Sequence, residues 1–153
     1  MVNAQIRKLA GFGVIFALLV VSVGAYTRLA DAGLGCPDWP GCYGFLTVPD
    51  QADEISLAET LYPDAPVEFA KAWWEMGHRY IAGALLLLVF LMLVKAYRGR
   101  HTEDTPLTLT VVLMVVILCQ AAFGAWTVTL KLWPQVVTGH LLGGFTTLSL
   151  IWL

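Results

Sequence analysis

Three ionisable side chains occupy apolar stretches of this sequence, where a charge is costly. Glu75 and His78 are three residues apart, so on a helix they share one face. His140 lies in another apolar stretch, which begins after Pro134. Ionisable residues inside a membrane mark function by default, and neutral imidazoles are common metal ligands. The first hypothesis is a metal centre bound by both histidines. The alternative places Glu75 among lipid headgroups and makes His78 a satisfied core histidine.

The composition places these residues in a membrane protein. Of the 153 residues, 58% are hydrophobic and 13% are charged, and the mean hydropathy is +0.73. A soluble domain averages about 45–50% apolar and about 25% charged residues, and small domains bury the smallest fraction of their surface. These values exclude a compact soluble domain, a disordered chain and a disulfide-rich secreted scaffold. The net charge of −2 argues against a nucleic-acid partner.

Four apolar segments approach the length of about 20 residues that a helix needs to cross a bilayer. We expect an all-α membrane protein, with residues 1–153 forming one four-helix transmembrane bundle. The expected spans are 9–27, 70–95, 106–129 and 134–153, with an outer loop at 28–69. The last span ends at Leu153 without a polar exit, so we expect a fragment or a truncated reading frame.

The distribution of Lys and Arg predicts the orientation. Arg7 and Lys8 precede the first span, and three further basic residues follow the second span in the connection 95–105. This bias puts the N-terminus in the cytoplasm and the acidic, cysteine-containing loop 28–69 outside the cell (inner) membrane. A signal peptide is the weaker interpretation of the first span, because its apolar run is long for one.

The two histidines are expected at similar depth. His78 lies about 12 Å and His140 about 9 Å below the outer surface, at roughly 1.5 Å per helical residue. Their spans run in the same direction, so the imidazoles can bind opposite faces of one iron. Ala82 and Gly144, one turn beyond each histidine, leave room for a flat macrocycle or serve helix packing. A haem needs only two axial histidines, whereas a closed zinc site needs four ligands.

Further candidate residues lie near the outer ends of the spans. Arg28 and Arg79 can pair with haem propionates, or can instead reach toward lipid headgroups. Cys36 and Cys42 can form a disulfide on the oxidising side, either as a structural staple or as a redox site. Gln120 lies inside the third span and needs a hydrogen-bond partner there.

The chain also contains a weak internal sequence similarity. The first span ends in GAYT at 24–27, and the third span ends in GAWT at 124–127. Each is followed by a Trp-Pro pair and then by a helix with a histidine near its outer end. The two helix pairs are therefore candidate parallel repeats, although so few matching residues fit coincidence equally well.

Taken together, several segments resemble the haem A synthase family of cytochrome oxidase assembly. The matching segments are 26–29 (YTRL), 33–42 (GLGCPDWPGC), 75–83 (EMGHRYIAG), 124–129 (GAWTVT) and 134–144 (PQVVTGHLLGG). The family is similar in fold to two fused four-helix bundles related by a pseudo-two-fold axis. The resemblance therefore implies that this chain is the N-terminal half of an eight-helix architecture, and the second bundle is absent from it.

The resemblance also implies an activity. The family oxidises the C8 methyl group of haem O to a formyl group by successive hydroxylation, with oxygen from water. His78 and His140 match its axial histidines, and Cys36 and Cys42 match its outer-loop cysteine pair. Glu75 matches the glutamate near the substrate, where it would accept a proton or stabilise charge.

Cofactors and partners follow from the same resemblance. This half would hold the haem O substrate, and a haem b would belong to the other half. The expected partners are a second four-helix half or a second copy, an electron acceptor and haem O synthase. Two alternatives remain open. His78 and His140 alone allow a four-helix b-type cytochrome that carries electrons, and Cys36 and Cys42 allow a membrane thiol oxidoreductase.

Overall fold

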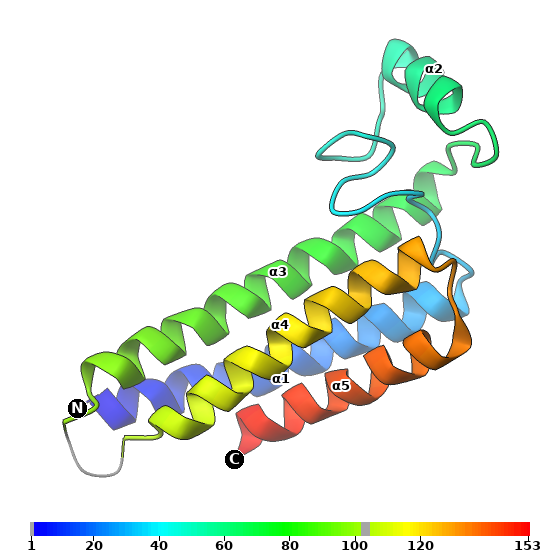
Figure 1. The fold of residues 1–153 in the computed structure, drawn as a ribbon. Helices are drawn as coiled ribbons and strands as arrows, with labels where there is room; N and C mark the ends of the chain where they lie inside the picture. Colours follow the sequence, from blue (N-terminus) through cyan, green and yellow to red (C-terminus); the bar gives the residue numbers. More distant parts are fainter. Residues whose placement is uncertain (1, 102–104) are drawn as a thin grey trace.

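The protein is all-helical in the computed structural model, which describes residues 2–101 and 105–153. The helices are α1 (Val2–Leu29), α2 (Ala52–Leu61), α3 (Phe69–Arg98), α4 (Leu107–Thr129) and α5 (Pro134–Trp152) (Figure 1). No strand occurs in these two ranges, which confirms the predicted all-α class. Residue 1 and part of the predicted connection 95–105, at 102–104, lie outside the described residues.

Three of the described helices are long and apolar enough to cross a membrane. They are Ala4–Leu29 of α1, the whole of α3 and the whole of α4. This finding fits a multi-pass membrane protein. Helix α5 has 19 residues, but Gln135, His140 and several Thr and Ser residues lower its mean hydropathy. The crossing predicted for 134–153 therefore stays a prediction.

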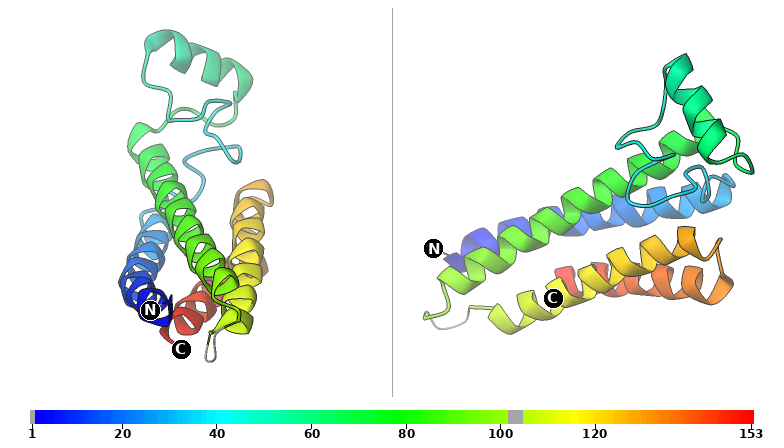
Figure 2. Two further views of the ribbon diagram at one scale, coloured as in Figure 1. Left: turned by 90° about the vertical axis from the view of Figure 1, so that its left-hand side faces the viewer. Right: turned by 45° about the horizontal axis from the view of Figure 1, so that its top comes forward.

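The four long helices pack side by side in a ring. Helix α1 contacts α3 and α5, and α4 contacts the same two helices. Within the described residues, neither diagonal pair, α1 with α4 or α3 with α5, brings two Cα atoms within 8 Å. Figure 2 shows the same helices from two further directions, obliquely along the helices in the left view. The two helices that carry the histidines therefore lie diagonally across the centre of the packing.

An apolar stripe on α3 continues into the position of His78. The buried residues of this stripe are Leu85, Val89, Met92 and Ala96, at the alternating intervals of four and three that face a helix core. The same intervals of three and four residues, counted back from Leu85, give Ala82 and then His78. The sequence therefore directs the imidazole inward, at the end of α3 nearest the outer loop.

The outer loop folds onto the start of α3 around a small core of its own. Cys36, Cys42, Tyr43, Val48 and Ala58 pack there with Ala72 and Met76 of α3. Helix α2 in this loop begins where the Glu54 carboxylate accepts the main-chain N–H of Asp50 at 3.1 Å and that of Gln51 at 3.4 Å. The loop is thus an ordered unit seated on one end of the helix packing.

Candidate functional site

His78 of α3 lies against a glycine of the neighbouring helix α1. A Cβ atom added to Gly24 would be only 2.7 Å from Cε1 and 3.1 Å from Nε2 of the ring. Real Cβ atoms do not approach other atoms this closely. Gly24 is therefore needed for α1 to pass the imidazole at this distance.

His140 of α5 has an equivalent neighbour on α4. A Cβ atom added to Gly124 would lie 3.3 Å from Cε1 of the His140 ring, which is tighter than ordinary van der Waals contact. The main chain at Val20 lies beside the His78 ring, and the main chain at Gln120 lies beside the His140 ring. Gly24 and Gly124 are 100 residues apart in the sequence, and so are Val20 and Gln120.

The ends of α1 and α4 repeat the same local geometry. The main-chain N–H of Ala32 donates to the Thr27 carbonyl at 2.9 Å, and that of Leu132 donates to the Thr127 carbonyl at 2.7 Å. These positions are again 100 residues apart. The internal sequence similarity thus extends to the structure: α1 and α4 end with the same hydrogen bond, and each has a glycine against a histidine. The pairs α1–α3 and α4–α5 therefore share these local contacts at one end, and their relation as repeats stays a prediction.

The two imidazoles are left with an unused nitrogen. Nδ1 of His78 and Nδ1 of His140 are buried and have no hydrogen-bond partner among the residues that the structure describes. Both rings lie near the same end of the helix packing, because α1 and α4 both finish at the end that carries the outer loop (Figure 1). No group of three or more His, Cys, Asp or Glu side chains in the described residues could hold a metal ion. The arrangement therefore suits a group that takes one imidazole from each of two helices.

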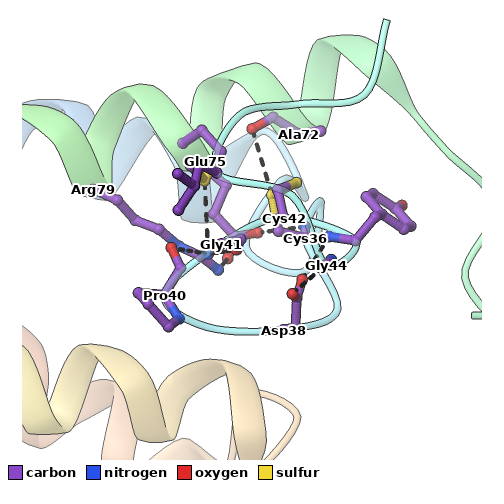
Figure 3. The surroundings of a disulfide bond; sticks show 12 residues. Cys36, Asp38, Pro40, Gly41, Cys42, Gly44, Ala72, Glu75 and Arg79 are labelled. Atoms are coloured by element: carbon purple, nitrogen blue, oxygen red, sulfur yellow. Dashed lines mark hydrogen bonds and ion pairs between the residues drawn. A yellow bond between two sulfur atoms is a disulfide. The ribbon is translucent and has the colours of Figure 1, made fainter. Parts of the chain in front are cut away.

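Glu75 lies one turn before His78 and is bound to the disulfide loop. Its carboxylate accepts the main-chain N–H of Cys36 at 3.0 Å and forms an ion pair with Arg79 (Figure 3). The Arg79 guanidinium also donates to the carbonyl of Pro40 at 3.3 Å and to that of Gly41. Both side chains are largely buried, 6% exposed for Glu75 and 12% for Arg79. This cluster holds the loop against α3.

Cys36 and Cys42 form a disulfide that closes the loop. Both cysteines are completely buried, and Sγ of Cys36 lies 3.8 Å from the Ala72 carbonyl. A Cβ atom added to Gly35 would be 2.6 Å from the Ala72 main-chain nitrogen, so the loop backbone packs directly on α3. The disulfide ring therefore reaches the turn of α3 just before His78.

The structure brings most of the predicted site residues together, but not all in the predicted way. Glu75, Arg79 and the two cysteines form one cluster beside His78. Arg79 is committed to this cluster, and sequence reasoning missed its bonds to the loop carbonyls. Arg28 has an exposed side chain at the end of α1 and lies outside the cluster. A propionate-binding role remains a prediction for both arginines.

Gln120 has a partner that the sequence did not identify. Its Nε2 donates to the main-chain carbonyl of His140 at 2.8 Å. The sequence signalled only that a polar group at this depth needs a partner. The spacing of four residues between Gln120 and Gly124 was the available hint, because it puts both on the face of α4 that meets α5.

Comparison with known proteins agrees with these features. A sequence profile described as "cytochrome oxidase assembly protein" matches residues 7–153. The chain belongs to this family. It is 52% identical over 147 residues to a protein named heme A synthase from Shewanella oneidensis, covering 96% of this chain and 44% of that protein. It is 31% identical over 127 residues to a heme A synthase from Exiguobacterium sibiricum, covering 83% and 35%. The chain thus spans less than half the length of these relatives.

Proposed function

We propose that this chain is the substrate-holding, N-terminal half of a haem A synthase. In this proposal it oxidises the C8 methyl group of haem O to a formyl group by successive hydroxylation. The observation that carries the proposal is the pair of matching glycine–histidine contacts on the helix pairs α1–α3 and α4–α5. Family membership supports it, because the curated relatives carry the name heme A synthase.

The residues fit an iron macrocycle held between two helices. His78 and His140 come from the diagonal helices α3 and α5, and each ring has a buried nitrogen without a partner in the described part of the chain. Gly24 and Gly124 have no side chain, so the helix backbone can lie close to each imidazole ring. Bundles commonly build cofactor sites from side chains on facing helices. Bound haem O would supply both the redox-active iron and the methyl group that is oxidised.

Glu75 is the proposed proton acceptor. Oxidising a methyl group with oxygen from water releases protons as well as electrons, so a base near the reacting carbon is needed. Glu75 shares a helix face with His78 and is held in place by Arg79 and the Cys36 N–H. These contacts orient the carboxylate and compensate for its burial. They also make it an anchor of the disulfide loop, and the two roles are compatible.

The rest of the assembly follows from the same proposal. The four long helices would form one transmembrane bundle over residues 1–153, which is half of an eight-helix, pseudo-two-fold protein. A second half or second copy would carry haem b and pass electrons to an acceptor, and haem O synthase would supply the substrate. The N-terminus would lie in the cytoplasm, with the loop 28–69 outside the inner membrane. Arg28, exposed at the end of α1, would be the freer arginine for a propionate.

Product analysis tests this function. The full-length protein is expressed from its whole reading frame in cells that make haem O, and extracted haems are identified by mass. We expect haem A from the wild type, none from His78→Ala, and a strong loss from Glu75→Gln. The matched control is Glu59→Gln, which changes an exposed carboxylate on α2. Absence of haem A from the wild type, with haem O present, would refute the proposal.

The alternatives explain fewer of the contacts. A b-type cytochrome would account for the histidine pair but not for the Glu75–Arg79 cluster. It would be supported by protein that binds haem b and leaves haem O unchanged. A thiol oxidoreductase needs an accessible sulfur for exchange, whereas Cys36 and Cys42 are both fully buried. Full activity in Cys36→Ser would argue further against it.

A further inference from the structure

Helix α4 contacts the His140 segment at two points, one turn apart. Gly124 lies against the imidazole ring, and Gln120 binds the main-chain carbonyl of the same residue. Residues four apart lie on one helix face, at a spacing of about 6 Å along the axis. One helix therefore contacts both the ring and the backbone of a single residue on its neighbour.

The Gln120 amide fits into a space that Gly143 of α5 leaves beside Gly144. A Cβ atom on Gly143 would overlap Oε1 of Gln120 and lie 2.7 Å from its Cδ, and one on Gly144 would lie 3.5 Å from its Nε2. The carbonyl of His140 has two lone pairs, so it can accept this bond in addition to its helical bond. The missing side chain of Gly143 thus explains how a polar side chain reaches the backbone of a packed helix.

His78, the equivalent histidine on α3, has no such glutamine on the neighbouring helix α1. Val20 occupies the position on α1 that corresponds to Gln120, and a valine side chain cannot donate a hydrogen bond. The His78 turn of α3 is held instead by Arg79, which follows His78 and binds the disulfide loop. Each histidine-bearing helix is therefore fixed near its histidine, but by a different contact.

We infer that Gln120 is a positioning residue for the His140 ligand. By holding the His140 carbonyl, Gln120 sets the rotation and height of this turn of α5 against α4, and so the direction in which the imidazole points. The inference rests on the proposed function, in which His140 and His78 bind one haem. It adds Gln120, with Gly143 as the residue that makes room for it, to the parts of the site.

The test uses the full-length protein in detergent with ferric haem b as the probe. Two readouts are measured: the share of low-spin, bis-imidazole iron by electron paramagnetic resonance, and the rate of haem transfer to apomyoglobin. The His78→Ala/His140→Ala double variant gives the baseline, because any haem bound elsewhere contributes equally to it. Thermal unfolding of each variant is followed in parallel.

The variants form a double-mutant cycle. Gln120→Ala removes the hydrogen bond, and Gly143→Ala displaces the amide with a methyl group while Gln120 stays in place. The control is Gly83→Ala on α3, where an added Cβ meets nothing within 4 Å. Hydrogen bonds between membrane helices have modest strength, so we expect haem loss about threefold faster in either variant, and at most about twentyfold. In the same variants, a fraction of the bound iron should become high-spin.

The Gln120→Ala/Gly143→Ala double variant and the wild type separate the possible outcomes. If Gly143→Ala acts through Gln120, it should add nothing in the Gln120→Ala background. Additive effects, or wild-type spin state and haem loss in both single variants, would overturn the inference. So would a lower unfolding temperature with an unchanged spin state, because that is the signature of a purely structural contact. A wild type without any histidine-dependent haem signal would instead refute the proposed function.

Discussion

Replacing Gly24 with alanine should weaken haem binding more than it weakens the fold. The new Cβ would lie 2.7 Å from Cε1 of His78, whereas carbon atoms pack at about 3.5–4.0 Å. The ring must therefore shift by roughly 1 Å. The helices can survive this shift because a side chain, not a backbone, is displaced. A displaced imidazole, however, no longer points its ligating nitrogen at the iron.

The magnitudes come from two opposing effects on the free energy of unfolding. Replacing a glycine inside a helix with alanine gains about 1 kcal/mol, and overpacking loses about 1–3 kcal/mol. The net loss of stability should be about 0–2 kcal/mol. Disturbing the support of a metal ligand typically lowers affinity about 10- to 100-fold. We expect haem affinity to fall by at least about 10-fold, or about 1.4 kcal/mol.

Haem titration followed by optical absorption measures this effect, with thermal unfolding of the apoprotein beside it. Gly124→Ala should have a smaller effect, because its Cβ would lie 3.3 Å from the His140 ring. Gly83→Ala, with nothing within 4 Å, should bind haem as the wild type does. The reasoning is refuted if Gly24→Ala binds haem as tightly as Gly83→Ala, or if Gly124→Ala proves the more harmful variant.

Two further predictions concern the outer loop. Arg79→Gln should destabilise the protein by roughly 3–5 kcal/mol, because it leaves the buried Glu75 carboxylate unpaired. Arg79→Gln/Glu75→Gln should recover most of this loss in thermal unfolding, and a double variant as unstable as the single one would contradict the account. Burial, with the nearby Glu68 carboxylate, raises the pKa of the Tyr43 phenol, which donates to the Pro66 carbonyl at 3.0 Å. The loop should therefore stay closed below pH 10 and loosen as the pH rises through the folded-state pKa. Phosphine reduction of the disulfide measures this loosening, and Tyr43→Phe should lose the alkaline dependence.

The sequence predicted the helical class because that class depends on local patterns, whereas the roles of the site residues stay predictions. The spacing of apolar residues on α3 places His78 on its buried face. The GAYT and GAWT segments contain the two glycines that lie against the histidines, but these contacts became visible only in the structure. The fourth crossing was less well supported, because the polar residues of α5 lower its hydropathy.

Contacts between distant segments could not be predicted in the same way. The bonds from Arg79 to Pro40 and Gly41 depend on how the disulfide loop folds back, which no helical spacing encodes. The acceptor of Gln120 is a main-chain carbonyl, and every residue of α5 has one. Glu75 was expected at membrane depth from its position in the second span, but its burial beneath the loop and its bond to Cys36 required the three-dimensional structure.

The central claim is that His78 and His140 bind one haem together, and electron paramagnetic resonance of the full-length protein tests it most directly. The spectra of His78→Ala, His140→Ala and the double variant are compared with that of the wild type after loading with haem. If both histidines bind the same iron, either single substitution should remove the same low-spin signal, and the double variant should remove nothing more. The signal left in the double variant is the baseline from haem bound elsewhere. A low-spin signal above this baseline in both single variants, or losses that add in the double variant, would contradict the shared site.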